Sequence, residues 1–241
     1  MFDDIAIKAA ADAMIQFGVN EAHKIIEDSG FDTSDIQPLA RRLIKESEVG
    51  QVLIFSAYLE EQFKTLLCLH MHDVNNNEAK NRLFDMAGVL DSFSKRILLS
   101  YHLGWLRKET QQSLNQLRQI RNEYAHRAFN LSPSDPKIKS HWARLETAHR
   151  PTLDKMLEAH EQFKEYRNPP ESAVRLAILV LIALAVVEDL MVLPVAMRVR
   201  VDPGHIMGDY SKLPSRLKRH LLDFTEACLE IFYYTKNPTT L

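Results

Sequence analysis

The chain contains 241 residues, of which 46% are hydrophobic and 26% charged, and these proportions are ordinary for a soluble globular protein. Its formal net charge of −2 gives no overall attraction to nucleic acid, so a nucleic-acid site would have to be a local basic patch. A chain of this length can bury one large core, or one core with a smaller appendage.

The composition favours helices over sheet, because it includes only 7 glycines beside 10 prolines and few alternating β-branched residues. We therefore predict an all-α fold, an antiparallel helical bundle with a C-terminal helical layer. The segment Asn168-Pro169-Pro170 is the clearest linker. It separates a predicted helical bundle at 1–167 from a helical segment at 171–241, which we expect to pack on the bundle as one compact unit.

Three helical patterns occupy the first 70 residues. Residues 4–28 predict an amphipathic helix that stops near Gly30, since glycine readily takes the left-handed conformation of a helix end. Pro38 suits the first turn of a helix over 38–48. The strongest pattern covers 50–70. The apolar positions of the first and third patterns are Ile5, Ala9, Met14, Phe17, Ile25 and Ile26, and Val52, Phe55, Leu59, Phe63, Leu66 and Leu67.

The next patterns predict a short helical turn at 83–88, a helix at 92–103 and a helix at 110–128 with Thr110 as its N-terminal cap. Short connections between them favour antiparallel neighbours and hence a bundle. Residues 138–150 and 152–167 are also helical in pattern but mostly polar, which indicates an exposed element. Pro151 lies between them and either kinks one helix or separates two.

Residues 176–187 form a run of 12 positions without a polar side chain. A membrane-spanning helix needs about 20 such residues. Arg175 and Glu188-Asp189 flank the run, so we predict a buried core helix. Residues 192–201 alternate enough to predict a short extended segment, and 211–236 a closing helix. Its inward positions would be Leu213, Leu217, Leu221, Phe224, Cys228, Ile231 and Phe232.

The sequence also leads to expectations about the cellular location of the protein and about bound metals and cofactors. Cys68 and Cys228 both lie in apolar helical patterns, which is typical of reduced thiols in the cytosol. The N-terminal residues lack the basic and apolar regions of a signal peptide, so we expect a cytoplasmic protein without membrane contact. His70, His72 and Asp73 lie close together, but no second cluster stands at ligand spacing. We predict no metal site and no cofactor.

The segment LNQLRQIRNEYAHRAF at 114–129 carries the candidate functional residues. One helix face is apolar and formed by Leu114, Leu117, Ile120, Tyr124 and Ala128. Arg118, Asn122 and His126 form a polar row four residues apart on another side, with Arg121 at the edge of the apolar face. In an arbitrary sequence, such a group is most often a helix end with solvated polar residues.

The pattern Arg121-Asn122-x-x-x-His126 resembles the Arg-(Asn/Asp/His)-x-x-x-His signature of the HEPN superfamily of helical-bundle proteins. Three blocks also resemble the mannitol operon repressor (MltR-like) family, and they span 49–127, about the middle third of the chain. The blocks are SAYLEEQFKTLL (56–67), LFDMAGVLDSFSKRILLSYHLGWL (83–106) and LRQIRNEYAH (117–126). Many HEPN proteins are metal-independent ribonucleases, so the resemblance implies a helical bundle and a catalytic role for Arg121, Asn122 and His126.

These residue types suit RNA cleavage without a metal. Histidine transfers protons near pH 7, and arginine holds a phosphate through its planar fork. The attacking nucleophile would be the 2′-hydroxyl of the RNA, so no nucleophilic Ser or Cys is needed. A Gly-rich phosphate loop is missing from the sequence, which argues against a nucleotide hydrolase of that kind.

Further cations are candidates for contacting RNA phosphates, although a solvated basic face is the commoner arrangement. We single out Arg118, Arg127, Arg216, Lys218 and Arg219; the last three belong to a basic cluster with Arg198, Arg200, Lys212 and His220. Glu60 and Glu61 lie in the middle of their helix, where they are either solvated or orient the Arg/His group.

Arg121 and His126 are five residues apart, so on a straight helix they point about 140° away from each other. One helix cannot easily aim both at one phosphate, whereas two helix ends meeting across a two-fold axis can. The HEPN resemblance also implies such a composite site. We therefore predict a homodimer with a shared site.

Two other functions remain open. A mannitol-operon-repressor-like transcriptional regulator would work through protein partners or RNA, because the chain has no convincing helix-turn-helix and no zinc-finger spacing. Arg121, Asn122 and His126 would then form a binding pocket or a structural hydrogen-bond cluster. The third alternative is the toxin half of a two-gene toxin–antitoxin module.

Overall fold

The computed structural model describes residues 4–72, 74, 76–85, 88–126, 135–163 and 169–238, with side chains from residue 8 onward. Within these ranges the chain forms ten α-helices, two 3-10 helices and no strand, which confirms the predicted all-α fold. The α-helices are α1 (Asp4–Glu27), α2 (Ile36–Leu43), α3 (Glu48–His70), α4 (Asn77–Phe84), α5 (Phe93–His102), α6 (Lys108–His126), α7 (Pro136–Ala159), α8 (Glu171–Val199), α9 (Pro203–Met207) and α10 (Ser215–Lys236), and the 3-10 helices are η1 (Glu161–Phe163) and η2 (Tyr210–Lys212).

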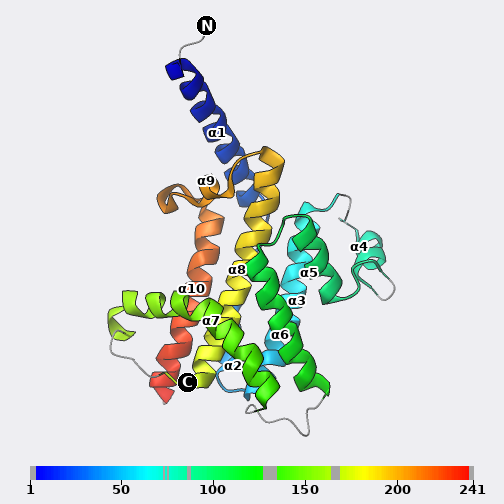
Figure 1. Cartoon of the computed structure of the whole chain (residues 1–241), viewed down its shortest axis with the longest axis vertical. Coiled ribbons are helices and arrows are strands. Elements are labelled where there is room, and N and C mark those ends of the chain that lie inside the picture. The colour runs from blue at the N-terminus through cyan, green and yellow to red at the C-terminus, as the bar shows by residue number, and fades with distance from the viewer. Residues whose placement is uncertain are drawn as a thin grey trace.

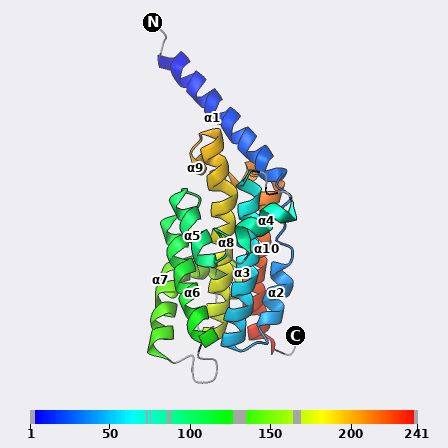
Figure 2. The ribbon, with the colours of Figure 1, turned by 90° about the vertical axis from the view of Figure 1, so that its right-hand side faces the viewer.

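Helix α8 runs through the middle of the bundle, and the other long helices surround it (Figures 1 and 2). It contacts α1, α2, α3, α6, α7 and α10. Most of its side chains are buried, on every side of the helix. A helix that is apolar all round is stable in water only where neighbours cover it on all sides. The apolar residues of α8 and α10 therefore join those of α1–α7 in one core.

The predicted buried helix at 176–187 is confirmed, but α8 is longer than predicted at both ends. The expected extended segment at 192–201 is wrong, because α8 continues through Pro194 to Val199 and ends at Arg200, which has a φ of 58°. A short alternating apolar run cannot by itself distinguish a strand from a buried helix. Here Met191, Val192 and Val195 are all buried, and this packing stabilises the helix around the proline.

Among the described helices, α8 alone is long and apolar enough to cross a membrane. In the fold, 78% of its most apolar 18-residue window is buried inside the protein. Neighbouring helices therefore cover the apolar surface that the sequence pattern presents.

Other boundaries differ from the predicted ones. Of the two alternatives for Pro151, the structure shows one helix, because residues 136–159 form the single helix α7 with Pro151 inside it. The expectation of an exposed or projecting element is wrong for one face of α7 only, because Trp142, Leu145 and Leu153 are buried on the face toward the bundle, whereas most of its other residues are exposed or partly buried. Thr110 is a buried residue inside α6 and not its cap. Helix α2 already ends at Leu43, and Ser47 caps α3 by accepting a hydrogen bond from the Gly50 amide at 3.2 Å.

The first half of α1 extends beyond the bundle (Figure 2). Of its predicted apolar positions, Met14 is 75% exposed and Phe17 is 68% exposed, whereas Ile26 is buried. Packing begins at Gly18, where an added Cβ would collide with the Val201 side chain. The amphipathic pattern therefore predicts the helix, but only its second half has a partner in the fold.

The exposed half of α1 leads to a stability prediction. We expect Phe17→Ser to change the free energy of unfolding by less than about 0.5 kcal/mol, because the side chain has little surface to lose from the core. Phe55→Ala, at a position with 0% exposure, should cost about 3–5 kcal/mol. Urea unfolding of both variants checks this, and a loss of more than about 2 kcal/mol with Phe17→Ser would contradict it.

A buried polar cluster connects α10 to the loop before α2. The Thr33 hydroxyl donates to Asp223 Oδ2 at 2.8 Å and lies 2.8 Å from His220 Nδ1. Since its one proton goes to the carboxylate, Thr33 accepts from Nδ1–H of the imidazole. His220 Nε2 is buried without a hydrogen-bond partner among the described residues. Protonation would place a second N–H there without an acceptor, and burial lowers the pKa of His220 to about 4.

The buried neutral imidazole makes stability pH-dependent. The unfolded state binds a proton at His220 near pH 6.5 and the folded state only near pH 4, so stability falls as the pH decreases between these values. Between pH 7 and pH 4, wild type should lose roughly 3 kcal/mol more than His220→Asn, whose amide can still donate to Thr33 but does not titrate. Denaturant unfolding across this range measures the difference, and identical pH dependence in both proteins would contradict the assignment.

Candidate functional site

The helix that carries the motif, α6, is fixed at its start by a carboxylate of the central helix. Asp189 is completely buried in α8, and its Oδ2 accepts a hydrogen bond from the Arg107 backbone N–H at 2.8 Å. The Arg107 Nε pairs with the other oxygen of the same carboxylate. A carboxylate at a helix N-terminus satisfies an amide that the helix itself leaves free. This contact sets where α6 begins.

The apolar face of α6 packs into the bundle as the sequence predicts. Leu114, Leu117, Ile120 and Tyr124 are all 0% exposed, and Ala128 lies outside the described residues. Helix α6 contacts α3, α5, α7 and α8. Tyr124, within the motif itself, is therefore a core residue that holds the last turns of α6 against the bundle.

The hydroxyl of Tyr124 contacts Glu48 within a group of four residues from four helices. We call this group the Glu48 cluster: Glu48, Tyr124, Trp142 and Arg175. Glu48 Oε1 accepts hydrogen bonds from Tyr124 at 2.5 Å and from the Trp142 indole at 3.0 Å. Glu48 Oε2 accepts from Arg175 at 2.6 Å. The Arg175 guanidinium lies 5.2 Å from the centre of the Trp142 ring, a distance that suits a cation–π contact.

The Glu48 cluster is almost closed to water. The side chain of Arg175 is 5% exposed and that of Glu48 is 11% exposed. Burial raises the pKa of Tyr124, and the hydrogen bond to Glu48 raises it further. Glu171 and Glu146 approach the same guanidinium from its outer side, so the arginine is paired on several edges. The cluster is a structural support beneath the motif.

The candidate catalytic residues lie on the solvent side of the same turns. His126 is exposed in the last turn of α6, and the Arg121 side chain is 41% exposed. Arg121 donates a long hydrogen bond of 3.4 Å to Asn122 Oδ1 and lies 3.9 Å from Glu60 Oε1 on α3. Of the two uses considered for Glu60, the ion pair therefore favours orienting Arg121. Glu61 is exposed.

The other predicted phosphate-binding residues are used in different ways. Arg118 is half-buried, and its Nε has no hydrogen-bond partner among the described residues. Arg127 lies outside the described residues. Arg216 donates to the carbonyls of Glu27 and Phe31, Lys218 to the carbonyl of Ser211, and Arg219 pairs with Asp223. The three α10 cations therefore connect α10 to neighbouring segments and to itself.

The described part of the chain holds no group of three His, Cys, Asp or Glu side chains arranged to bind a metal ion. The Arg121, Asn122 and His126 group thus consists of a cation, an amide and an imidazole at a helix end. These groups can bind an anion and exchange a proton with it.

The sequence pattern does not reveal that Glu48, Asp189 and Arg175 are partners of the motif helix. Their contacts join residues 76 to 127 positions apart, and helical periodicity carries no information about such pairs. The sequence does contain an indication of these contacts, because Glu48, Arg175 and Asp189 lie within or next to strongly apolar helical patterns. Buried charges of this kind are normally paired.

No protein-family model, curated protein or solved structure matches the chain. The resemblance to HEPN proteins therefore rests on Arg121-Asn122-x-x-x-His126 alone, and the resemblance to the mannitol operon repressor family on the three sequence blocks.

Removing the charge of Glu48 should destabilise the protein. We expect Glu48→Gln to lower the free energy of unfolding by about 3 kcal/mol, because Arg175 would remain buried without its main counter-charge. The last turns of α6 should also exchange their amide hydrogens faster, since the Tyr124 hydroxyl would lose its charged acceptor.

The matched control is Glu46→Gln, an exposed glutamate just before α3, which should change the free energy by less than about 0.5 kcal/mol. Urea unfolding and hydrogen exchange measure both effects. Equal stability of the two variants would show that the Glu48 cluster does not support α6.

Proposed function

We propose that the protein acts on RNA, as a metal-independent endoribonuclease whose site contains Arg121, Asn122 and His126 and is completed by a second copy of the chain. The observation that carries the proposal is the exposure of Arg121 and His126 at the end of a helix that is otherwise firmly packed. Polar residues placed on a rigid support are typical of functional sites.

The contacts of Arg121 leave it able to bind a phosphate. The guanidinium has five N–H donors, and its hydrogen bond to Asn122 is long. The ion pair with Glu60 is also long and partly exposed, so it orients the side chain at little energetic cost to a competing phosphate. Arg121 would hold the scissile phosphate and stabilise the charge that develops on it.

His126 is the residue suited to proton transfer. In the proposed reaction the 2′-hydroxyl of the RNA attacks the adjacent phosphorus, the bond to the 5′-oxygen of the next nucleotide breaks, and a 2′,3′-cyclic phosphate forms. The imidazole would take the proton from the attacking hydroxyl or give one to the leaving oxygen. Asn122 would orient a phosphate oxygen through its amide N–H groups.

The directions of the side chains support a site shared between two copies. Arg121 and His126 project about 140° apart from α6, so Arg121 of one copy and His126 of the other would face one phosphate across a two-fold axis. An isologous contact of this kind would create two identical sites per homodimer.

Cleavage of labelled total RNA with excess chelator present tests the catalytic roles. We expect wild type to cleave, His126→Ala to lose about 100-fold or more in rate, and Arg121→Ala to lose at least a similar factor. His102→Ala is the matched control, because His102 is also an exposed histidine in the last turn of a helix, α5. Equal activity in wild type and His126→Ala would remove His126 from the mechanism.

Mixing two inactive variants tests the shared site. If each site takes Arg121 from one copy and His126 from the other, a mixed dimer of Arg121→Ala and His126→Ala contains one intact site. Half of the dimers would be mixed after exchange, so about a quarter of the wild-type activity should return. No recovery in an exchanging dimer, or a strict monomer by light scattering, would contradict the shared site. Absence of cleavage by any folded variant would instead favour the regulator that works through protein partners.

A further inference from the structure

A cavity of about 1190 Å³ lies where α1, the C-terminal ends of α3 and α8, and the corner before α6 meet. It is distinct from the Arg121 group, because none of the motif residues lines it. Ligand sites for small molecules usually measure about 300–1,000 Å³, so this hollow is large enough for an extended ligand.

The floor of the cavity is apolar. Ile26, Val74, Met191 and Val195 line it and are each no more than 3% exposed, and the partly buried Trp105 forms one side. Met71 and Met197 also border the cavity. Methionine side chains are flexible and polarizable, so they adapt well to a ligand without a fixed shape. Such walls suit a flexible hydrocarbon chain.

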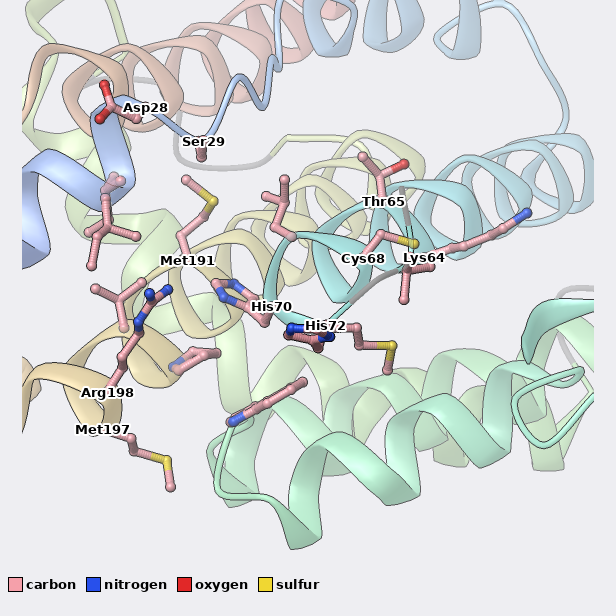
Figure 3. Close-up of a pocket in the computed structure, with 18 of the residues that line it drawn as sticks. Asp28, Ser29, Lys64, Thr65, Cys68, His70, His72, Met191, Met197 and Arg198 are labelled. Atoms are coloured by element: carbon pink, nitrogen blue, oxygen red, sulfur yellow. The ribbon is translucent and has the colours of Figure 1, made fainter. Parts of the chain in front are cut away.

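One part of the cavity holds an arginine beside two histidine rings. Figure 3 shows the Arg198 guanidinium and the rings of His70 and His72 in the same hollow; Arg198 comes from the end of α8, His70 is the last residue of α3, and His72 follows two residues later. Arg198 forms no ion pair or side-chain hydrogen bond within the part of the chain that the structure describes. Arginine is the side chain best suited to a planar carboxylate.

His70 is held in place by the fold. Its Nε2 lies 2.5 Å from the Leu190 carbonyl, which can only accept, so this nitrogen carries the proton and donates to the carbonyl. Nδ1 of the neutral ring is then an acceptor, so a carboxylate would be bound by Arg198, and His70 would form the wall beside it. The ring also packs edge-to-face against Trp105, with centroids 5.8 Å apart. Burial lowers the pKa of His70, and the nearby charge of Arg198 lowers it further. Figure 3 shows the Arg198 guanidinium next to the His70 ring.

The remaining charges of the cavity leave it weakly cationic. Lys64, Lys80 and Arg198 line it, against the two carboxylates Asp28 and Glu61. Lys64 lies 5.6 Å from the centre of the Phe84 ring, and Figure 3 shows it extending away from Arg198. Neither carboxylate pairs with Arg198 in the described residues. Arg198 is thus an unpaired cation, among the described residues, at the α8 end of the cavity.

We propose that this cavity binds an amphipathic anion, a long hydrocarbon chain with one carboxylate, whose head group pairs with Arg198 beside His70 and whose chain lies on the methionine-lined floor. The two features are complementary, because the apolar floor contributes affinity and the cation fixes the orientation.

Calorimetric titration with hexadecanoate below its micellar concentration tests the proposal. We expect one molecule to bind per chain, and Arg198→Gln to weaken binding about tenfold or more, the effect of losing one charge-assisted pair. Arg200→Gln is the matched control, since Arg200 is an exposed arginine two residues further on that does not line the cavity. It should bind hexadecanoate like wild type.

Two further probes test separately what the charged head group and the hydrocarbon chain contribute to binding. Hexadecanol, which has no charge, and inorganic phosphate, which has no chain, should each bind at least about tenfold more weakly than hexadecanoate. Trp105, one of two tryptophans in the chain, should change its fluorescence on binding, and Trp105→Phe should abolish that change.

The proposal is overturned if hexadecanoate does not bind, or if Arg198→Gln and Arg200→Gln have equal effects. It is also overturned if hexadecanol or phosphate binds as well as hexadecanoate. Because Arg198 is exposed and has no partner in the described chain, its replacement tests binding with little risk to folding.

Discussion

The ion pair between Glu48 and Arg175 is the constraint on which the arrangement of the bundle depends. Two charges buried this deeply are stable only if both find complementary partners, and here the partners come from α3, α6, α7 and α8. Satisfying all of these contacts at once restricts how far the four helices can shift relative to one another. Hydrophobic packing alone would tolerate small shifts of these helices, whereas the hydrogen bonds to Glu48 do not.

The Glu48 cluster also explains how the exposed motif residues are held in place on the rigid helix α6. Tyr124 lies between Arg121 and His126 in sequence, and its hydroxyl reaches inward to Glu48 while its neighbours face solvent. At the other end of α6, Asp189 holds the Arg107 amide. Both anchors connect α6 to buried groups of the central bundle, so the exposed residues of the last turn are positioned by the core rather than by each other.

Much of the fold was predictable because helical periodicity is a local property. The apolar repeats of α3, α6 and α10 identify residues that are buried in the structure, and the polar-free run at 176–187 identifies the core of α8. The predictions are wrong where the conformation or the burial of a segment depends on whether another helix packs against it. Residues 192–201 are helical because neighbours cover them, and Met14 and Phe17 are exposed because the described fold offers no surface to cover them.

The sequence by itself determined the helices, their buried faces and the chemical types gathered in the motif, since each depends on residues within a few turns of one another. Only the tertiary structure decided which charges meet. It pairs Glu48 with Arg175, places Glu60 beside Arg121, uses the α10 cations within the fold, and leaves Arg198 free among the described residues beside an apolar hollow. These pairings join distant positions, and their energies depend on burial and on distances of a few ångströms that no local pattern specifies.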